Sequence, residues 1–417
     1  MAIIKAFKAV RPAPDKVHLV ASRSVDAYSK VELNARLSIN PYSFLHIIKP
    51  EFNDEVKSKS NTNSLLEKIK KKYIKFIDEE IFIHDKKDSI YVYQQISEWR
   101  TFTGFVACAA ADDYTNNIIK IHEQTLAEKE EKLKEYLEVC DFNAEPVCFG
   151  HDNNEVLENY LNDVVRERNT TYDFTSFDKI RHKIWVVDKP NEIENIQTIF
   201  KKIGNIYIAD GHHRSASSTR LAHWRREQLK NYTGQENFNF FLGIFFSEKQ
   251  LKIVEFNRLV KDLNGLASDD FLVELKKTFV VHKLHKDDSK PTQLHQINIY
   301  VNKCWYSLTP LHGTFNDKDP VLSLDAQILS DNILSPILNI HDLRSDSRVA
   351  FVPGIIPTLE LEKLVDSGKY AVAFVLFSVS MQQLKDVADS GKIMPPKSTW
   401  VEPKLRSGLI VFDLERS

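Results

Sequence analysis

The chain has 417 residues, of which 42% are hydrophobic and 27% charged, and this predicts a globular protein with two or three cooperating lobes. Its formal charge is -2 and its pI is near 6.7. The overall positive field used in non-specific nucleic-acid binding is therefore not expected, nor is a nucleic-acid partner, and a small or locally charged ligand fits better.

Neither a secretory signal nor a membrane span is expected. Residues 1–16 lack the apolar core of a signal peptide, and no apolar window approaches the length of a membrane span. The cysteines form no C-x-x-C pair and are too few for a disulfide scaffold. They are Cys108, Cys140, Cys148 and Cys304. The sequence thus predicts reduced thiols in a cytoplasmic protein with no membrane partner.

The N-terminal range, 1–150, is expected to form an α/β lobe. Short strands are predicted at 89–96 and 103–110, followed by a highly charged helix over 123–139. Near the start of the chain, the segment "RPAP" holds Arg11 in an extended conformation. Arg11 could reach an anionic substrate, or it could seat the first strand.

The middle range, 151–235, alternates between helical and strand patterns. Helices are predicted at 155–168 and 190–203, strands at 183–188 and 205–209, and a further helix near Gly211. This alternation predicts crossover units and a partly parallel sheet. The last range, 236–417, contains mostly strand-like runs, with helices at 323–333 and 380–390. The fold class expected for the chain is α/β to α+β with mixed sheets.

The segment "IADGHHR" is the clearest candidate for a functional site. A strand that turns through Gly211 into a helix leaves the first helical N–H groups without intrahelical partners, at the positive end of the helix dipole. Gly211 lets a phosphate approach closely, and Arg214 can offer it a charged fork. Asp210 either caps the helix or holds a metal ion or orients a nucleophile.

The two histidines of this segment, His212 and His213, are candidates for proton transfer because their charge changes near neutral pH. The purely structural alternative is a capped helix with solvent-exposed histidines. A zinc site is not expected, because adjacent residues rarely face one ion and no suitable Cys or His partners are spaced nearby.

Two further segments carry candidate residues. In "KIHEQT", His122 and Glu123 fall at the predicted start of the charged helix, where they could share a proton or simply cap that helix. In "MPPKSTWVEPK", three prolines stiffen a loop that presents cations and hydroxyls suited to phosphate recognition. Its candidates are Lys397, Ser398, Thr399 and Lys404. The alternative is a rigid surface connection with solvated lysines.

These segments resemble known patterns. The "DGHHR" box after a strand resembles the Gly-x-x-Arg phosphate-binding turn of the ParB/sulfiredoxin superfold, and the order strand-helix-strand-helix from Ile184 onward is similar to its core. More widely, the chain resembles the uncharacterised domain-of-unknown-function family 1015. The resemblance is carried by "FKAVRP" at 7–12, "NPYSFLHIIKPE" at 40–51, "GFVA" at 104–107, "IKIHEQT" at 119–125, "RHKIW" at 181–185, "FNRLV" at 256–260, "SDSRVAFVPG" at 345–354 and "MPPKSTWVEPKLRSGL" at 394–409. One departure is Asn257, where the family often has histidine.

Two functions follow as hypotheses. The first is an enzyme acting at phosphorus, a phosphotransferase or phosphohydrolase that binds a nucleotide or phosphorylated metabolite at Gly211–Arg214. The resemblance implies ATP or ADP, with Mg²⁺ as a candidate ion, and a small metabolite such as serine or phosphoserine, in a kinase-like or phosphatase-like reaction. The second is a nucleotide-gated binding module related to ParB. The near-neutral charge favours the enzyme, because a DNA clamp should carry a basic surface.

Overall fold

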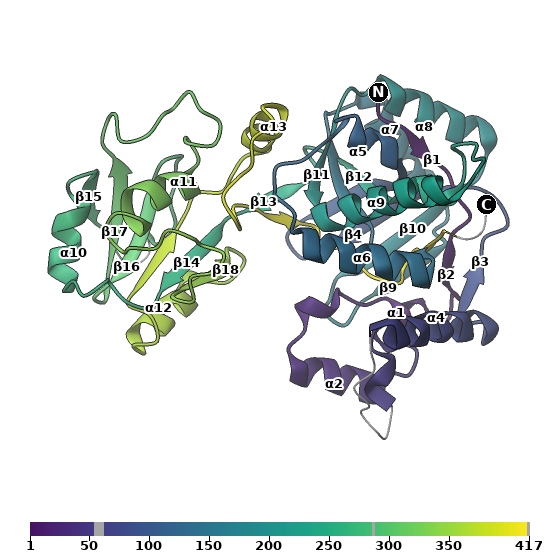
Figure 1. Cartoon of the computed structure of the whole chain (residues 1–417), viewed down its shortest axis with the longest axis horizontal. Helices are drawn as coiled ribbons and strands as arrows, with labels where there is room; N and C mark the ends of the chain where they lie inside the picture. Colours follow the sequence, from purple (N-terminus) through teal and green to yellow (C-terminus); the bar gives the residue numbers. More distant parts are fainter. Residues whose placement is uncertain (54–61, 286–287, 415–417) are drawn as a thin grey trace. The chain divides into compact units, whose positions relative to one another are not determined.

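The computed structural model describes residues 1–53, 62–285 and 288–414, and the chain divides into two compact units (Figure 1). Unit 1 consists of Met1–Lys120, Thr125–Leu251 and the tail from Pro403, and unit 2 consists of Ile121–Gln124 and Lys252–Glu402. The boundaries expected at 150 and 235 both lie inside unit 1. The reason is that strands from both ranges share the backbone hydrogen bonds of one sheet.

The central sheet of unit 1 has nine strands within the described residues, in the order β6-β11-β8-β12-β5-β4-β10-β9, with β1 also paired to β5. Its strands are β1 (Ile4–Lys5), β4 (Ile90–Ile96), β5 (Thr101–Ala110), β6 (Ile119–Lys120), β8 (Val147–His151), β9 (Tyr172–Thr175), β10 (Arg181–Val187), β11 (Ile206–Asp210) and β12 (Phe240–Ser247). β12 is buried along its whole length, as its apolar sequence predicts.

This sheet is mixed, which confirms the predicted fold class. β11 runs parallel to β6 and β12 runs parallel to β8, whereas the other pairings are antiparallel. The predicted crossover from β10 to β11 is present, but four strands (β4, β5, β12 and β8) lie between these two in the sheet. Alternating helical and strand patterns predict a crossover, but they do not say how many places in the sheet it spans.

The helices of unit 1 follow the predicted periodicity closely in the middle of the chain. They are α1 (Val17–Val20), α2 (Lys30–Ile39), α3 (Leu45–Ile48), α4 (Thr62–Asp78), α5 (Ala111–Thr115), α6 (Ala127–Cys140), α7 (Glu155–Glu167), α8 (Pro190–Lys202) and α9 (His212–Gln228), with 3-10 turns at Val25–Ala27, Pro50–Asn53 and Asn237–Asn239. The side chain of Asn154 caps α7, and Pro190 begins α8. Phe200 of α8 packs against Phe105 and Phe245 of the sheet.

The charged helix differs from the prediction at its start. α6 begins at Ala127, not at residue 123, and its N-cap residue is Leu126. The preceding residues Ile121–Gln124 belong to unit 2, so they are not part of this helix. α6 lies beside α9 (Figure 1), and Arg220 of α9 pairs with Glu130 and Glu131 of α6 at 3.1 and 2.5 Å.

The C-terminal tail returns to the N-terminal part of unit 1. Val10 and Val411 exchange backbone hydrogen bonds of 2.9 and 2.8 Å. Two small sheets complete the unit, formed by β2 (Val10–Pro12) with β3 (Phe82–His84), and by β7 (Phe142–Asn143) with β21 (Phe412–Asp413). These pairings hold the tail in unit 1 although 151 residues of unit 2, Lys252–Glu402, precede it.

Unit 2 is built on a six-stranded antiparallel sheet, in the order β15-β17-β16-β19-β14-β18, with a separate pair formed by β13 and β20 in the described residues. Its strands are β13 (Lys252–Val254), β14 (Phe256–Val260), β15 (Phe279–Lys283), β16 (Ile297–Val301), β17 (Cys304–Pro310), β18 (Val349–Pro353), β19 (Val372–Val375) and β20 (Trp400–Glu402). Its helices are α10 (Ser268–Leu275), α11 (Asp325–Leu329), α12 (Thr358–Asp366) and α13 (Met381–Asp389), with a π-helical turn at Ser330–Leu334.

Both faces of this second sheet are buried. Val260 and Phe374 belong to the apolar cluster that includes Phe271 of α10, whereas the neighbouring Leu259 and Ala373 belong to the cluster that includes Leu361 of α12. Successive residues of a strand point to opposite faces, so helices cover the sheet on both sides. The described residues include no helix long and apolar enough to cross a membrane.

Candidate functional site

The turn between β11 and α9 has the boundaries that the sequence predicts. β11 ends at Asp210, and Gly211 is the N-cap residue of α9. Gly211 has φ 105° and ψ 30°, a left-handed conformation that residues with a side chain rarely adopt. The N-cap residue of this 17-residue helix thus has no side chain of its own, and the start of α9 is a locally positive helix terminus.

The side chain of Arg214 folds back over this turn. A Cβ atom on Gly211 would lie 2.9 Å from Nε of Arg214 and 3.0 Å from its Nη2, so the guanidinium occupies space that only glycine leaves open. Nη1 donates a hydrogen bond of 2.8 Å to the carbonyl of Pro146. The remaining N–H donors of Arg214 have no hydrogen-bond partner in the described part of the chain. Its side chain is 26% exposed, so these donors can be reached from solvent.

Three other charged side chains surround Arg214. Oδ2 of Asp210 lies 3.8 Å from Nη2, and Oε2 of Glu145 lies 3.9 Å from Nη1, beyond hydrogen-bond length. Nζ of Lys404 lies 3.3 Å from Oδ2 of Asp210. The predicted residues Asp210, Gly211, Arg214 and Lys404 are thus neighbours in unit 1. Asp210 is not the capping residue, because Gly211 occupies that position.

The two histidines have different environments. His212 is buried, at 4% exposure, which differs from the solvent-exposed alternative. His213 is half-buried, and its Nδ1 atom has no hydrogen-bond partner among the described residues. Burial lowers the pKa of His213, the nearby Lys129 lowers it further, and Glu130 opposes both. His213 is therefore neutral at pH 7 and able to accept a proton.

A cavity of about 230 Å³ opens beside Arg214, within unit 1. Its walls come from α3, α6, β7, the segment between β7 and β8, the start of β8, α9 and the start of β12. The residues that line it are Phe44, Ile48, Leu133, Tyr136, Leu137, Asn143, Ala144, Glu145, Val147, Arg214, Ser218, Phe241 and Leu242. Sequence reasoning missed this cavity and Glu145, since neither is signalled by local periodicity or by a motif.

The other predicted residues lie mainly in unit 2. His122 is buried and its carbonyl accepts a hydrogen bond of 2.9 Å from the backbone N–H of Met394. Glu123 is exposed, and both belong to the short segment Ile121–Gln124 that packs with unit 2. The predicted helix-capping alternative for this pair is wrong, because α6 starts only at Ala127.

The Pro-rich loop belongs to both units, because Lys397, Ser398 and Thr399 are in unit 2 and Lys404 is in unit 1. Lys397 has φ 55°, and its Nζ lies 5.5 Å from the ring centre of Phe256. The hydroxyl of Ser398 donates to the carbonyl of Pro395 at 2.7 Å. The Ser398 hydroxyl is thus bonded within the loop itself, and the stiffness expected from the prolines stays a prediction.

Arg258, which the sequence reasoning did not single out, supports this loop. It is fully buried on β14 and donates to the carbonyls of Phe256 and, at 3.1 Å, of Lys397. Burial lowers its pKa to about 9, so it remains charged at neutral pH. No carboxylate lies within 4 Å of it in the described residues, and the ring of Phe351 lies 5.5 Å away. An arginine inside an apolar strand pattern is the signal that could have identified it.

The side chains of Arg11 and Asn257 both bond to other residues of the protein. Arg11 pairs with Asp85 at 2.7 Å and donates to the hydroxyl of Tyr172 at 2.6 Å, which matches the strand-seating alternative. Asn257 is buried, and its side-chain oxygen accepts the N–H of Leu376 at 3.3 Å.

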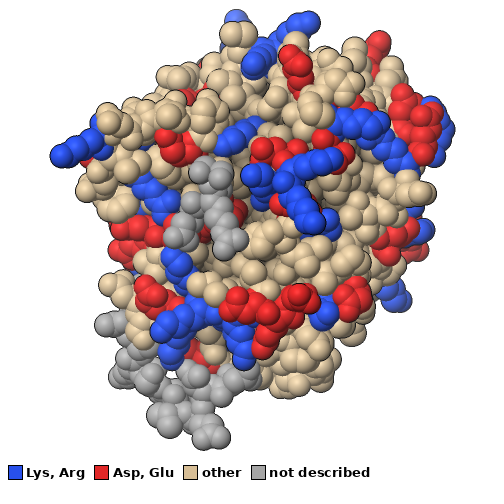
Figure 2. Space-filling view, turned by 90° about the vertical axis from the view of Figure 1, so that its right-hand side faces the viewer, with Lys and Arg blue, Asp and Glu red and all other residues tan. Residues whose placement is uncertain are grey.

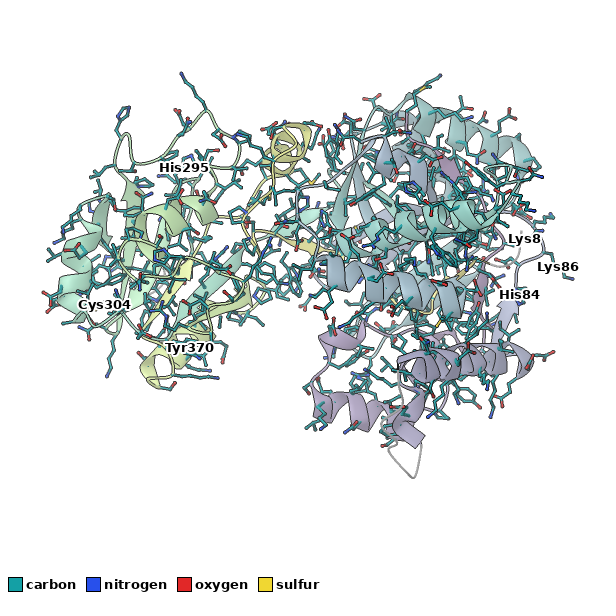
Figure 3. All side chains as sticks on the ribbon, viewed as in Figure 1. Lys8, His84, Lys86, His295, Cys304 and Tyr370 are labelled. Atoms are coloured by element: carbon teal, nitrogen blue, oxygen red, sulfur yellow. The ribbon has the colours of Figure 1, made fainter. Side chains whose placement is uncertain are left out.

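Outside this site, charged side chains and the side-chain types that can bind metals are dispersed over the described residues. Figure 2 shows Lys and Arg side chains interspersed with Asp and Glu over the face that it presents. His84 lies in unit 1 near Lys8 and Lys86, whereas His295 and Cys304 lie in unit 2 (Figure 3). Within the described ranges, no group of three or more His, Cys, Asp or Glu side chains could hold a metal ion.

The model of a family described as "Protein of unknown function (DUF1015)" matches residues 4–327. The chain belongs to this family. The DUF1015 range includes the Asp210–Arg214 turn, and it ends within α11, so the motifs at 345–354 and 394–409 lie beyond it. No curated protein matches the chain.

Several solved structures are similar to this DUF1015 chain at low identity. One is a mutant free serine kinase in complex with AMP, with a TM-score of 0.38, 10% identity, and coverage of 74% of this chain and 91% of that chain. A conserved hypothetical protein from Pyrococcus furiosus has a TM-score of 0.36, 11% identity and coverages of 74% and 96%. SbnI with a C-terminal truncation, from Staphylococcus aureus, has a TM-score of 0.36, 12% identity and coverages of 71% and 82%.

Proposed function

We propose that the protein is an enzyme acting at phosphorus on a small metabolite, and that the turn Gly211–Arg214 binds the phosphate groups of a nucleotide. The observation that carries this proposal is the guanidinium of Arg214. It folds over a glycine at φ 105° and makes one hydrogen bond in the described residues, with Asp210 and Glu145 3.8 and 3.9 Å away as ion-pair neighbours. Arginine presents N–H groups in a planar fork that matches phosphate oxygens. The start of α9, where the N-cap residue is glycine, adds backbone N–H groups and a positive dipole end.

The neighbouring side chains suit proton transfer in such a reaction. Asp210 lies within 4 Å of both Lys404 and Arg214, and His213 is held neutral by burial, so each can accept a proton at neutral pH. In a kinase reaction a substrate hydroxyl oxygen bonds to the terminal phosphorus, and the bond from that phosphorus to its bridging oxygen breaks. ADP departs with the electron pair, and the hydroxyl proton passes to Asp210 or His213.

In a phosphatase reaction water takes the place of the substrate hydroxyl. It attacks the phosphorus of the phosphorylated metabolite and the ester bond breaks. The water proton passes to Asp210 or His213, and this base then returns the proton to the leaving oxygen. Mg²⁺ commonly binds to one or two carboxylates together with substrate phosphates, and Asp210 is the carboxylate that fits this role. When bound, the ion neutralises phosphate charge.

The substrate and nucleotide are assigned from the resemblance of the "DGHHR" box to the ParB/sulfiredoxin superfold. That resemblance implies ATP or ADP as the nucleotide and serine or phosphoserine as the metabolite. His122, Glu123, Lys397, Ser398 and Thr399 stay candidates for the substrate end of the reaction, and we assign no shared site to them and Arg214.

A thermal-shift screen tests the proposal. A ligand that binds only the native state raises Tm by mass action, so ATP, ADP, CTP and phosphoserine are compared with and without Mg²⁺. We expect at least one of them to raise Tm in the native protein and not in Arg214→Ala. Equal shifts in both proteins would overturn the phosphate site. A ligand that binds without turnover would instead favour the nucleotide-gated module.

A further inference from the structure

The cavity beside Arg214 has the composition of a ligand pocket, not of a packing defect. Most of its wall is apolar, and Phe44, Tyr136 and Phe241 contribute aromatic side chains. Its volume of about 230 Å³ is below the roughly 300–1,000 Å³ of pockets for drug-sized ligands. It can therefore receive a small planar group, such as one end of a metabolite, but not a large ligand.

Two polar groups in this wall have no hydrogen-bond partner among the described residues, and neither is a fully buried atom. The side-chain oxygen of Asn143 accepts the N–H of Leu242 at 3.1 Å, whereas its amino group has no hydrogen-bond partner among the described residues. The same holds for the hydroxyl of Ser218 on α9. Asn143 is 8% exposed and Ser218 is 7% exposed. Both groups are accessible from the cavity that they line, and an amide donor and a hydroxyl in an apolar wall suit a ligand with polar edges.

The cavity and the proposed phosphate site share one residue, Arg214. Arg214 lies in the cavity wall and also folds over Gly211. Ser218 follows Gly211 by seven residues, a distance of about 10 Å along the helix axis at about 1.5 Å per residue. A nucleotide spans such a separation between its base and its outer phosphates. A ligand whose phosphates contact Arg214 can thus place its uncharged end between α6, α9 and β12.

We propose that this cavity is the base-binding subsite of the protein and that it takes the purine ring of the bound nucleotide. This inference rests on the proposed function, because it requires a nucleotide at Gly211–Arg214. A purine is planar and stacks on aromatic side chains, and its ring nitrogens accept hydrogen bonds of the kind that the Asn143 amino group and the Ser218 hydroxyl can donate. A sugar or an aliphatic chain would not use both features of the wall.

Titration calorimetry with ADP, GDP, CDP and pyrophosphate tests this inference. We expect the purine diphosphates to bind about 10-fold tighter than CDP or pyrophosphate, the equivalent of about 1.4 kcal/mol and within the range for one stacked base. The variant Ser218→Leu fills the cavity from a helical position. It should reduce ADP affinity to that of pyrophosphate and leave pyrophosphate affinity unchanged. Ser218→Ala, which removes only the hydroxyl, should give a smaller loss.

The matched control is Ser38→Leu, which makes the same replacement on an exposed face of α2 and should change neither affinity. Pyrophosphate binding that depends on Arg214, combined with equal affinity for ADP and pyrophosphate, would overturn the base subsite but leave the proposed function intact. If neither purine diphosphates nor pyrophosphate bind, the proposed function itself fails. If Ser218→Leu does not fold, an unchanged ADP affinity in Ser218→Ala together with no preference for purines would still overturn the inference.

Discussion

Replacing Arg214 by alanine is the most direct test of the proposed phosphate site. Apart from one hydrogen bond to Pro146, the guanidinium has donors available to a ligand in the described structure. A hydrogen bond to a charged group contributes about 1.5–3 kcal/mol. A two-pronged contact from a side chain that is 26% exposed should therefore contribute about 2–3 kcal/mol, because water screens part of it. We expect Arg214→Ala to weaken nucleotide binding about 30- to 150-fold.

Arg220→Ala is the control with the same change of charge. Arg220 lies on the same helix but pairs with Glu130 and Glu131 of α6, and its side chain is 42% exposed. Exposed ion pairs contribute about 0–1 kcal/mol to stability, and loss of the Pro146 hydrogen bond in Arg214→Ala should cost about 1 kcal/mol. Both variants should therefore fold, with similar small decreases in Tm.

Titration calorimetry of both variants, with the best ligand from the thermal-shift screen, measures the difference. The affinity of Arg220→Ala should fall by a small factor that disappears at high salt, since long-range charge is screened over about 10 Å at 0.1 M salt. The loss in Arg214→Ala should persist at high salt. Equal losses in the two variants would show that bulk charge explains the binding, and the argument from the Gly211 turn would then be wrong.

Three more outcomes follow from the geometry. Gly211→Ala should lower the free energy of unfolding, measured in urea, by about 1–3 kcal/mol, because alanine at φ 105° is strained and its Cβ would lie 2.9 Å from Nε of Arg214. An unchanged urea midpoint would refute this. His213→Asn should lower turnover about 100-fold or more with affinity nearly unchanged, whereas a change in affinity alone would make it a binding residue. Burial lowers the pKa of His182 to about 3, with Arg406 adding to the shift. Since an unfolded histidine titrates near 6.5, the unfolded state binds more protons between pH 6.5 and 3, so about 2 kcal/mol of stability should be lost by pH 5. His182→Gln should remove this part of the pH dependence of unfolding, and an unchanged slope would exclude the contribution of His182.

Local features of the fold could be predicted from the sequence where the hydrophobic periodicity agrees with the positions of proline and glycine. Pro190 at a helix start and the apolar run before Asp210 both lie where the structure has an element boundary. The turn at Gly211 was predictable for the same reason, since glycine supplies the left-handed conformation that links β11 to α9. Each of these features depends on residues within one helical turn or one strand.

Long-range features could not be predicted in this way. The segment around His122 reads as the start of a charged helix, but its backbone bonds to Met394, more than 250 residues later, and this contact places it in unit 2. The cavity beside Arg214 is another case, because Phe44, Asn143 and Phe241 come from distant parts of the chain. Periodicity records the face that a residue presents, but not the partner that covers it.

The contact between Lys404 and Asp210 shows how such a long-range arrangement is held. The sequence presents 394–404 as one stiff loop, but the chain passes from unit 2 to unit 1 between Glu402 and Pro403. The tail is then fixed at successive points: Arg406 pairs with Asp178 at 2.8 Å, and the hydroxyl of Ser407 donates to Glu145 at 2.7 Å. Lys404 lies directly before these anchors, so its place beside Asp210 is determined by the residues that follow it and not by the prolines that precede it. Glu145 also lies 3.9 Å from Arg214, so the tail contacts Asp210 directly through Lys404 and lies near Arg214 through Glu145.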